Sequence, residues 1–229
     1  HKICLETATQ INYIPEKAEL NRVLGCSYSK INQPKKALAC YEKFLGMPNE
    51  KMDDFKVATV CLDAGKLCTE SGDVKSAIYL YLECLNRAED NLELKQEVYE
   101  QLGDAFYKDS QYKNACKYYS EIDQRCIQEP DRRSQINYKL GKAEFCQKDI
   151  PMAIKYYYTA LDFAQDEKNK ADIFEALGEA FFLKKDYDSA ISCHTQNLEF
   201  ARRISDEKRL QIGYEKLGDA CSASGQWIL

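Results

Sequence analysis

Apolar residues recur along this chain at the three- and four-residue spacing of amphipathic helices, and short polar turns interrupt them at regular intervals. The stretch from Asp172 to Asp206 shows the pattern clearly: an apolar helical face, a polar turn at residues 184–186, and a second helix. It predicts a helical hairpin. Each helix of a lone hairpin has an apolar face with too little to cover it, so we expect the hairpin to be stable only when stacked between copies of itself.

A Leu-Gly or Ala-Gly pair marks the copies. Its glycines are separated by 40, 38, 38, 37 and 40 residues and are Gly25, Gly65, Gly103, Gly141, Gly178 and Gly218. In the first five units an alanine follows the glycine by twelve residues, and four residues later comes a tyrosine or, in the fifth unit, His194. The pattern predicts five helical hairpins and the first helix of a sixth.

The glycine of each pair lies in the middle of a predicted helix, where it costs roughly 1 kcal/mol relative to alanine. Its recurrence indicates that the second helix comes close at this point. We expect the alanine of the second helix to be the counterpart of the glycine, and the tyrosine or His194 ring to wedge between layers. Turn signals such as Ser71-Gly72-Asp73 predict short loops between the two helices.

These residues resemble the tetratricopeptide repeat, a helix-turn-helix unit of usually 34 residues. The resemblance covers nearly the whole chain and rests on the Leu-Gly pair, the aromatic three residues after glycine, the alanine and the tyrosine. The chain departs from the family in its longer units and in lacking the proline near the end of the second helix. It also has Asn21, Cys61 and Asn137 four residues before the glycine, where the family has an aromatic residue. Such long repeats are similar to those of Partner-of-Inscuteable-type adaptors and tonsoku-like scaffolds.

The resemblance implies an all-α fold, a right-handed superhelical solenoid of antiparallel helix pairs in one continuous array. We place each repeat boundary seven residues before its glycine. The predicted segments are a preceding helix over 1–17, repeats over 18–57, 58–95, 96–133, 134–170 and 171–210, and a partial sixth repeat over 211–229. Because the chain ends on apolar residues and not on a polar cap, we expect more chain to follow in the parent protein.

The composition suits a packed helical protein, with 45% hydrophobic residues in a chain of 229. Eleven cysteines occur without a CxxC or CxC spacing, and His1 and His194 are the only histidines, so we predict free, packed thiols and neither zinc nor any other metal. No apolar run is long enough to span a membrane, and residues 1–11 show no basic region followed by an apolar one, so we expect no signal peptide in this stretch. We expect an intracellular protein, cytoplasmic or nuclear.

No catalytic motif is present: the chain has no GxSxG, Walker loop, GxGxxG or HExxH. We therefore predict a protein that is not an enzyme and takes no cofactor. His194 and the cysteines hold repeat positions that elsewhere carry packed residues, so we interpret them as packing. Another possible class of protein is a thiol-based redox or metal module, which fast-reacting cysteines or bound zinc would identify.

The resemblance also implies a concave groove lined by the first helices, at positions 2, 5, 9, 12 and 13 of each repeat. These positions carry ten acidic and five basic residues over the six units. They predict binding of a peptide or domain that has Lys or Arg together with an apolar anchor. The candidate partner-binding residues are Glu97, Glu100, Asp104, Tyr107, Tyr138, Lys142, Phe145, Asp172, Glu175, Glu179, Phe182, Glu215 and Asp219.

Other interpretations of the same positions stay open or are disfavoured. The charges can be a solvated helix face, as most such charges are. A carboxylate clamp of the chaperone-binding kind is disfavoured because its positions are acidic or neutral here. Direct binding of nucleic acid is disfavoured by a net charge of −5 and a pI near 5.3. We predict a protein-interaction scaffold; the alternative is a regulatory or targeting segment of a larger enzyme or signalling protein.

Overall fold

The computed structural model describes residues 14–47, 53–88, 91–122 and 127–225, and all regular secondary structure in these ranges is helical. The helix predicted before Ala18 falls on residues 1–13, apart from the first turn of α2, and so lies outside the described residues. So do the last four residues of the sixth predicted unit.

The chain forms two compact units, His1–Ser110 and Gln111–Leu229. The helices of the first unit are α2 (Ile14–Lys30), α3 (Pro34–Leu45), α4 (Asp54–Ser71), α5 (Val74–Arg87) and α6 (Leu92–Lys108). Those of the second are α7 (Tyr112–Ser120), α8 (Pro130–Cys146), α9 (Ile150–Phe163), α10 (Glu167–Leu183), α11 (Tyr187–Arg203) and α12 (Glu207–Ser224).

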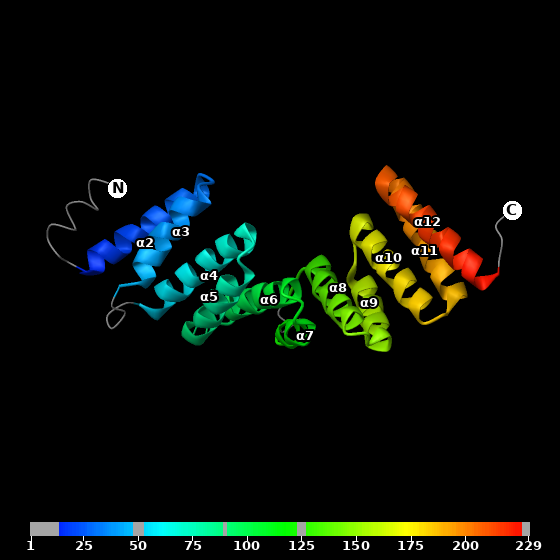
Figure 1. Ribbon diagram of the computed structural model, residues 1–229, viewed down its shortest axis with the longest axis horizontal. Helices are drawn as coiled ribbons and strands as arrows, with labels where there is room; N and C mark the ends of the chain where they lie inside the picture. The colour runs from blue at the N-terminus through cyan, green and yellow to red at the C-terminus, as the bar shows by residue number, and fades with distance from the viewer. Residues whose placement is uncertain (1–13, 48–52, 89–90, 123–126, 226–229) are drawn as a thin grey trace. The chain divides into compact units, whose positions relative to one another are not determined.

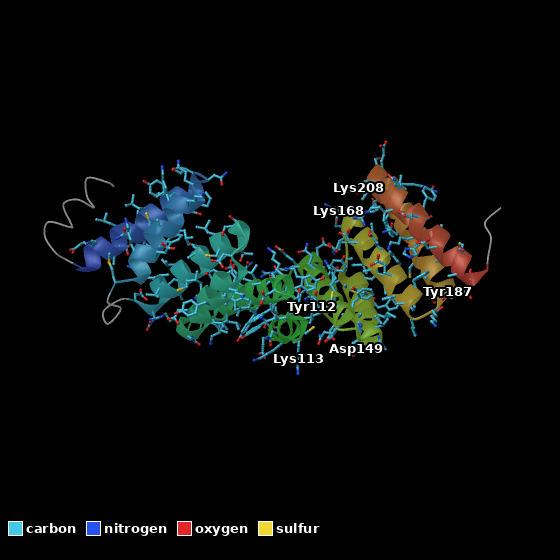
Figure 2. All side chains as sticks on the ribbon, in the orientation of Figure 1. Tyr112, Lys113, Asp149, Lys168, Tyr187 and Lys208 are labelled. Atoms are coloured by element: carbon cyan, nitrogen blue, oxygen red, sulfur yellow. The ribbon has the colours of Figure 1, made fainter. Side chains whose placement is uncertain are left out.

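Within each unit, successive helices pack as antiparallel neighbours (Figure 1). In the second unit, Lys168 and Lys208 in the first turns of α10 and α12 lie at one end, while Asp149 before α9 and Tyr187 at the start of α11 lie at the opposite end (Figure 2). First helices such as α10 therefore run opposite to second helices such as α11. The first helices begin four residues before the boundaries placed on the sequence, so each is one turn longer at its start.

The turn at the end of each first helix has the same backbone geometry. Seven residues after the repeat glycine the backbone is left-handed, with φ between 56° and 86°, at Asn32, Gly72, Ser110, Lys148, Lys185 and Gly225. An aspartate at the next position caps the second helix in three of the turns, as where Asp73 accepts a hydrogen bond from the backbone N–H of Ser76 at 3.2 Å. The predicted short turns are confirmed, including those in which no glycine supplies the left-handed residue.

The repeat glycine admits an aromatic ring from the second helix. A β-carbon at Gly65 would lie 2.4 Å from Cε1 of Tyr81, closer than real carbon contacts allow. Three further pairs have the same arrangement at 2.3–2.5 Å: Gly25 with Tyr41, Gly141 with Tyr157, and Gly178 with His194. The prediction that these rings wedge between layers is confirmed.

The prediction that the alanine is the counterpart of the glycine is only partly right. Alanines such as Ala77 and Ala190 are fully buried, as expected, and the carbonyl oxygen of Ala153 lies 3.2 Å from a β-carbon placed at Gly141, but the nearest atoms belong to the ring one turn further on. The alanine has a related role. Because it and the ring lie on one helical face, a small residue at the first position lets the second helix approach closely enough for the ring to reach the glycine.

The cysteines of the described ranges are free, and most are buried. Burial raises the pKa of Cys61 and Cys84 to about 12 each, so both are protonated at neutral pH. Their interpretation as packing residues agrees with this burial. Cys4 and Cys126 lie outside the described residues. Among the helices that are described, none is long and apolar enough to cross a membrane.

We predict opposite effects of one substitution at two equivalent glycines. Gly178→Ala places a β-carbon 2.4 Å from the His194 ring and should lower the free energy of unfolding by roughly 1–3 kcal/mol through overpacking. Gly218→Ala meets no described atom within 4 Å and should raise the free energy of unfolding by about 0.5–1 kcal/mol, since alanine is the better helix former. Urea unfolding followed by circular dichroism measures both. Equal effects at the two positions would contradict the ring contact.

Candidate functional site

The predicted partner-binding residues all lie on first helices. Glu97, Glu100, Asp104 and Tyr107 are on α6 in the first unit. The others are in the second unit, and we call the surface they form the first-helix face: Tyr138, Lys142 and Phe145 on α8, Asp172, Glu175, Glu179 and Phe182 on α10, and Glu215 and Asp219 on α12.

Arg209, which the sequence positions do not include, holds two of these carboxylates. Its guanidinium donates one hydrogen bond to Oδ1 of Asp172 and another, of 2.8 Å, to Oε2 of Glu175. Its Nε lies 3.6 Å from Oδ2 of Asp206. Only 13% of the Arg209 side chain is exposed. This arginine joins α12 to α10, so Asp172 and Glu175 serve the stacking of helices as well as the surface.

A second ion pair joins the same two helices, with Nζ of Lys216 3.0 Å from Oε1 of Glu179. The first unit has an equivalent of the Arg209–Asp172 pair. Lys56 on α4 lies 3.4 Å from Glu19 on α2, and these two residues hold the repeat positions of Arg209 and Asp172. In a related pair, Lys66 on α4 lies 2.6 Å from Glu97 on α6. Ion pairs between consecutive first helices are therefore a recurring feature of the fold.

These contacts correct the expected charge of the first helices. Over the six repeats, the positions counted on the sequence carry ten acidic and five basic residues, but Lys56, Arg209 and Lys216 pair with members of the set, which makes eight basic residues. The surplus is small, and Asp172, Glu175 and Glu179 are not free to meet a partner unless an ion pair is exchanged. Glu215 and Asp219 are exposed, and within the described ranges they have no ion pair.

The aromatic members of the face are partly buried against the core of the second unit. The ring centroids of Tyr138 and Tyr157 are 5.9 Å apart, and Nζ of Lys142 lies 5.6 Å from the centroid of Tyr138. The rings of Phe182 and Tyr187 meet edge to face at 5.6 Å. The face therefore presents partly covered rings with charged groups beside them, an arrangement suited to contact with another protein.

The titration behaviour of the face is that of packed, paired groups. Burial raises the pKa of Glu175 above its usual value, while the Arg209 guanidinium acts in the opposite direction. Burial, with the nearby carboxylates of Asp172 and Glu175, raises the pKa of Tyr138. In the part of the chain that the structure describes, no three His, Cys, Asp or Glu side chains are grouped so as to hold a metal ion.

His194 is a packing residue, as its repeat position indicates. Its side chain is 2% exposed, and its ring occupies the space beside Gly178. Burial lowers its pKa; among the charged groups nearby, Glu179 and Asp219 act to raise the pKa and Lys216 acts to lower it. An imidazole in this setting is neutral at pH 7.

Comparison with known proteins agrees with the repeat pattern. Residues 18–50, most of the first predicted repeat, match the family model of the tetratricopeptide repeat. A search of curated proteins gave no match.

Solved structures with the same fold include MamA, from residue 41 to its end, of Desulfovibrio magneticus RS-1. It is 19% identical with a TM-score of 0.65, over 85% of this chain and 99% of that chain. Another MamA crystal structure is 19% identical with a TM-score of 0.67, over 84% and 96% of the two chains. BtubC (BKLC) from P. vanneervenii is 19% identical with a TM-score of 0.66, over 86% and 83%. The match to the tetratricopeptide-repeat model thus covers residues 18–50, and the chain shares the helical-repeat fold of these solved structures.

We predict that Arg209 stabilises the second unit. Arg209→Met removes the partner of two half-buried carboxylates and should lower the free energy of unfolding by roughly 1–3 kcal/mol. The matched control is Arg203→Met. Arg203 pairs with Glu167 at 3.6 Å in a more exposed position, so its loss should lower the free energy of unfolding by less than about 0.5 kcal/mol. Urea unfolding at two salt concentrations measures both. If the two variants lose the same stability, the cluster does not join the helices.

His194 should make the stability of the second unit depend on pH. Its pKa is lowered in the folded state, so the unfolded chain binds the proton more readily and stability is lost as the pH falls below the ordinary value of 6.5. His194→Tyr restores the ring that the other units carry and should remove this loss, up to about 1.4 kcal/mol for each pH unit below 6.5. Unfolding of both proteins at pH 7.5 and 5.5 measures it. Identical pH dependence would show that His194 does not contribute.

Proposed function

We propose that this protein is a non-catalytic interaction scaffold, and that its first-helix face binds a partner peptide or domain with basic and apolar residues. The fold supports a binding role because stacked helical hairpins form extended surfaces of this kind. The observation that carries the partner's chemistry is the pair of exposed carboxylates on α12, Glu215 and Asp219, beside the paired carboxylates of α10.

The ion pairs of the face define how such a partner would bind. A lysine or arginine of the partner meets Glu215 and Asp219 directly, whereas it reaches Asp172 or Glu175 only by displacing Arg209. Exposed charges mainly set the rate and the salt dependence of encounter, and apolar contacts supply most of the affinity. Phe145 and Phe182, both half-buried on the face, are the rings to which we assign the apolar contacts.

The same charges argue against other partners. A net charge of −5 disfavours the phosphate backbone of nucleic acid, whose binding requires a basic surface. Arg209 and Lys216 on the face are themselves paired with carboxylates, and Lys142 lies over the Tyr138 ring, so these cations are poorly placed to hold the C-terminal carboxylate of a peptide. We therefore assign the face to proteins and not to nucleic acid.

The proposal is tested by charge reversal on α12. A library of labelled 12-residue peptides, each with two Lys or Arg and one aromatic or Leu, is screened by fluorescence polarisation, and the best binder becomes the probe. Glu215→Lys with Asp219→Lys should lower the affinity for the probe by about tenfold or more and reduce the salt dependence of its binding. These two positions are chosen because neither is used in an ion pair of the described helices, so the stacking should be kept.

The control for this experiment makes the same change of charge on second helices. Asp162→Lys with Glu199→Lys alters two exposed carboxylates of α9 and α11. Probe binding should stay within about twofold of wild type, because long-range charge effects are screened over roughly 8–10 Å at physiological salt. Equal weakening by both double variants, or none by either, would contradict a site on the first-helix face.

A further inference from the structure

The first unit has an open groove on its second helices, away from the candidate residues described above. The groove runs between α3 and α5, with α4 beneath it, and has a volume of about 450 Å³. Leu38 and Leu45 line one side, Tyr79 and Leu80 the other, and Cys68 is buried below them. This volume is within the range of ligand pockets, roughly 300–1,000 Å³.

The repeat pattern explains why this groove is open. Cys68 follows Gly65 by three residues, and the residue at the same position after Gly178 is Phe181. Phe181 is only 7% exposed and packs in the core of the second unit. Cys193 belongs to the same core, and Ile154 and Leu161 pack against it; these three residues hold the repeat positions of Leu80, Leu38 and Leu45. The two units thus have equivalent walls, with an aromatic ring between them in the second and a thiol in the first.

Two positions beside the Phe181 ring also differ between the two units. In the second unit Tyr158 meets Phe181 at a centroid distance of 6.3 Å, and Nζ of Lys184 lies 5.9 Å from the Phe181 centroid. The residues at these repeat positions in the first unit are Glu42 and Ser71. Where the second unit has a ring, a neighbouring ring and a cation, the first has a thiol, a carboxylate and a hydroxyl.

We propose that the groove between α3 and α5 binds a partner segment that inserts an aromatic side chain above Cys68 and places a Lys or Arg beside it, toward Glu42. The incoming ring takes the space that Phe181 fills in the second unit. The incoming cation takes the role of Lys184 over that ring, and in this unit it also meets the carboxylate that replaces Tyr158.

Charge at the rim supports a basic partner. Glu42 is exposed and has no ion pair within the described part of the first unit. Asp73 also lines the groove, where its carboxylate caps α5 through the N–H of Ser76, and Lys75 adds one opposing charge. Burial, together with the carboxylates of Asp73 and Glu42, raises the pKa of Cys68 on the floor of the groove.

The exposed ring of Tyr79 adds contact area. It is 69% exposed at the edge of the groove, more than any other large apolar or aromatic side chain in the described residues. An aromatic anchor beside such a ring gains edge or stacking contacts, and a cation over the inserted ring adds a favourable cation–π contact. The groove uses none of the thirteen predicted partner-binding residues, so this proposal stands apart from the one for the first-helix face.

The first test fills the groove from within. Cys68→Phe supplies the ring that the equivalent position of the second unit carries, and it should leave the thermal midpoint unchanged or higher. The probe is a Gly-Ser peptide with a central Lys-Phe-Lys, titrated into ¹⁵N-labelled protein. Amide shifts on α3 and α5 are expected for wild type, with affinity reduced about tenfold or more in Cys68→Phe. Loss of folding in Cys68→Phe would show that the groove cannot hold a ring and would overturn the proposal.

A second variant tests the charge without touching the buried floor. Glu42→Lys should lower the affinity for the Lys-Phe-Lys probe several-fold. This is roughly the effect expected from reversing one charge of an exposed pair. Glu70→Lys makes the same change at an exposed position of α4 that does not line the groove, and should leave the affinity unchanged. Peptides with Lys-Ala-Lys or Glu-Phe-Glu at the centre should bind more weakly than the probe.

Other results would overturn the proposal. If the probe changes no amide shifts on α3 and α5, the ring does not enter the groove. Equal affinity of the probe for wild type and Cys68→Phe would show the same. A wild-type dimer that Cys68→Phe converts to a monomer, measured by sedimentation, would assign the groove to a second copy of this chain. Preference for Glu-Phe-Glu over Lys-Phe-Lys would reverse the assigned charge of the partner.

Discussion

The contact between a mid-helix glycine and an aromatic ring of the next helix is the constraint on which this structure depends. The first helix loses roughly 1 kcal/mol of helix propensity at the glycine, and the second helix inserts a ring into the space that becomes available. Close-packed interiors do not leave such a space empty without cost. The replacement of tyrosine by His194 shows that a ring can fill the space beside the glycine without the tyrosine hydroxyl, because the geometry is kept there.

Much of this fold could be predicted from the sequence because each repeat uses the same contact between its two helices. The glycine, the alanine and the ring residue recur at constant spacing, so the helix pairs and their turns follow from periodicity alone. What the spacing cannot show is which of two residues on one helical face comes closer to the glycine. Ala190 and His194 are one turn apart, and only the distance between the helices decides that the ring fills the space.

The candidate site was predicted less completely, for a related reason. Positions were counted within each repeat, whereas the ion pairs join consecutive repeats. Asp172 and Arg209 are 37 residues apart, as are Glu19 and Lys56, so opposite charges three residues short of the 40-residue step between these repeats are the sequence signal that identifies both pairs. Long side chains reach across a helix interface, so the charge of a surface in a repeat protein belongs to neighbouring repeats together.

The groove in the first unit follows from the same regularity. In a single-core protein, replacing a large residue by a small one lets its neighbours collapse, and the cost depends on how far they can move. Here the walls on α3 and α5 are held by their own ring contacts, Tyr41 against Gly25 and Tyr81 against Gly65, so they stay apart when the residue between them is Cys68. A change at one repeat position, from an aromatic residue to a thiol, thus accompanies an open groove between α3 and α5.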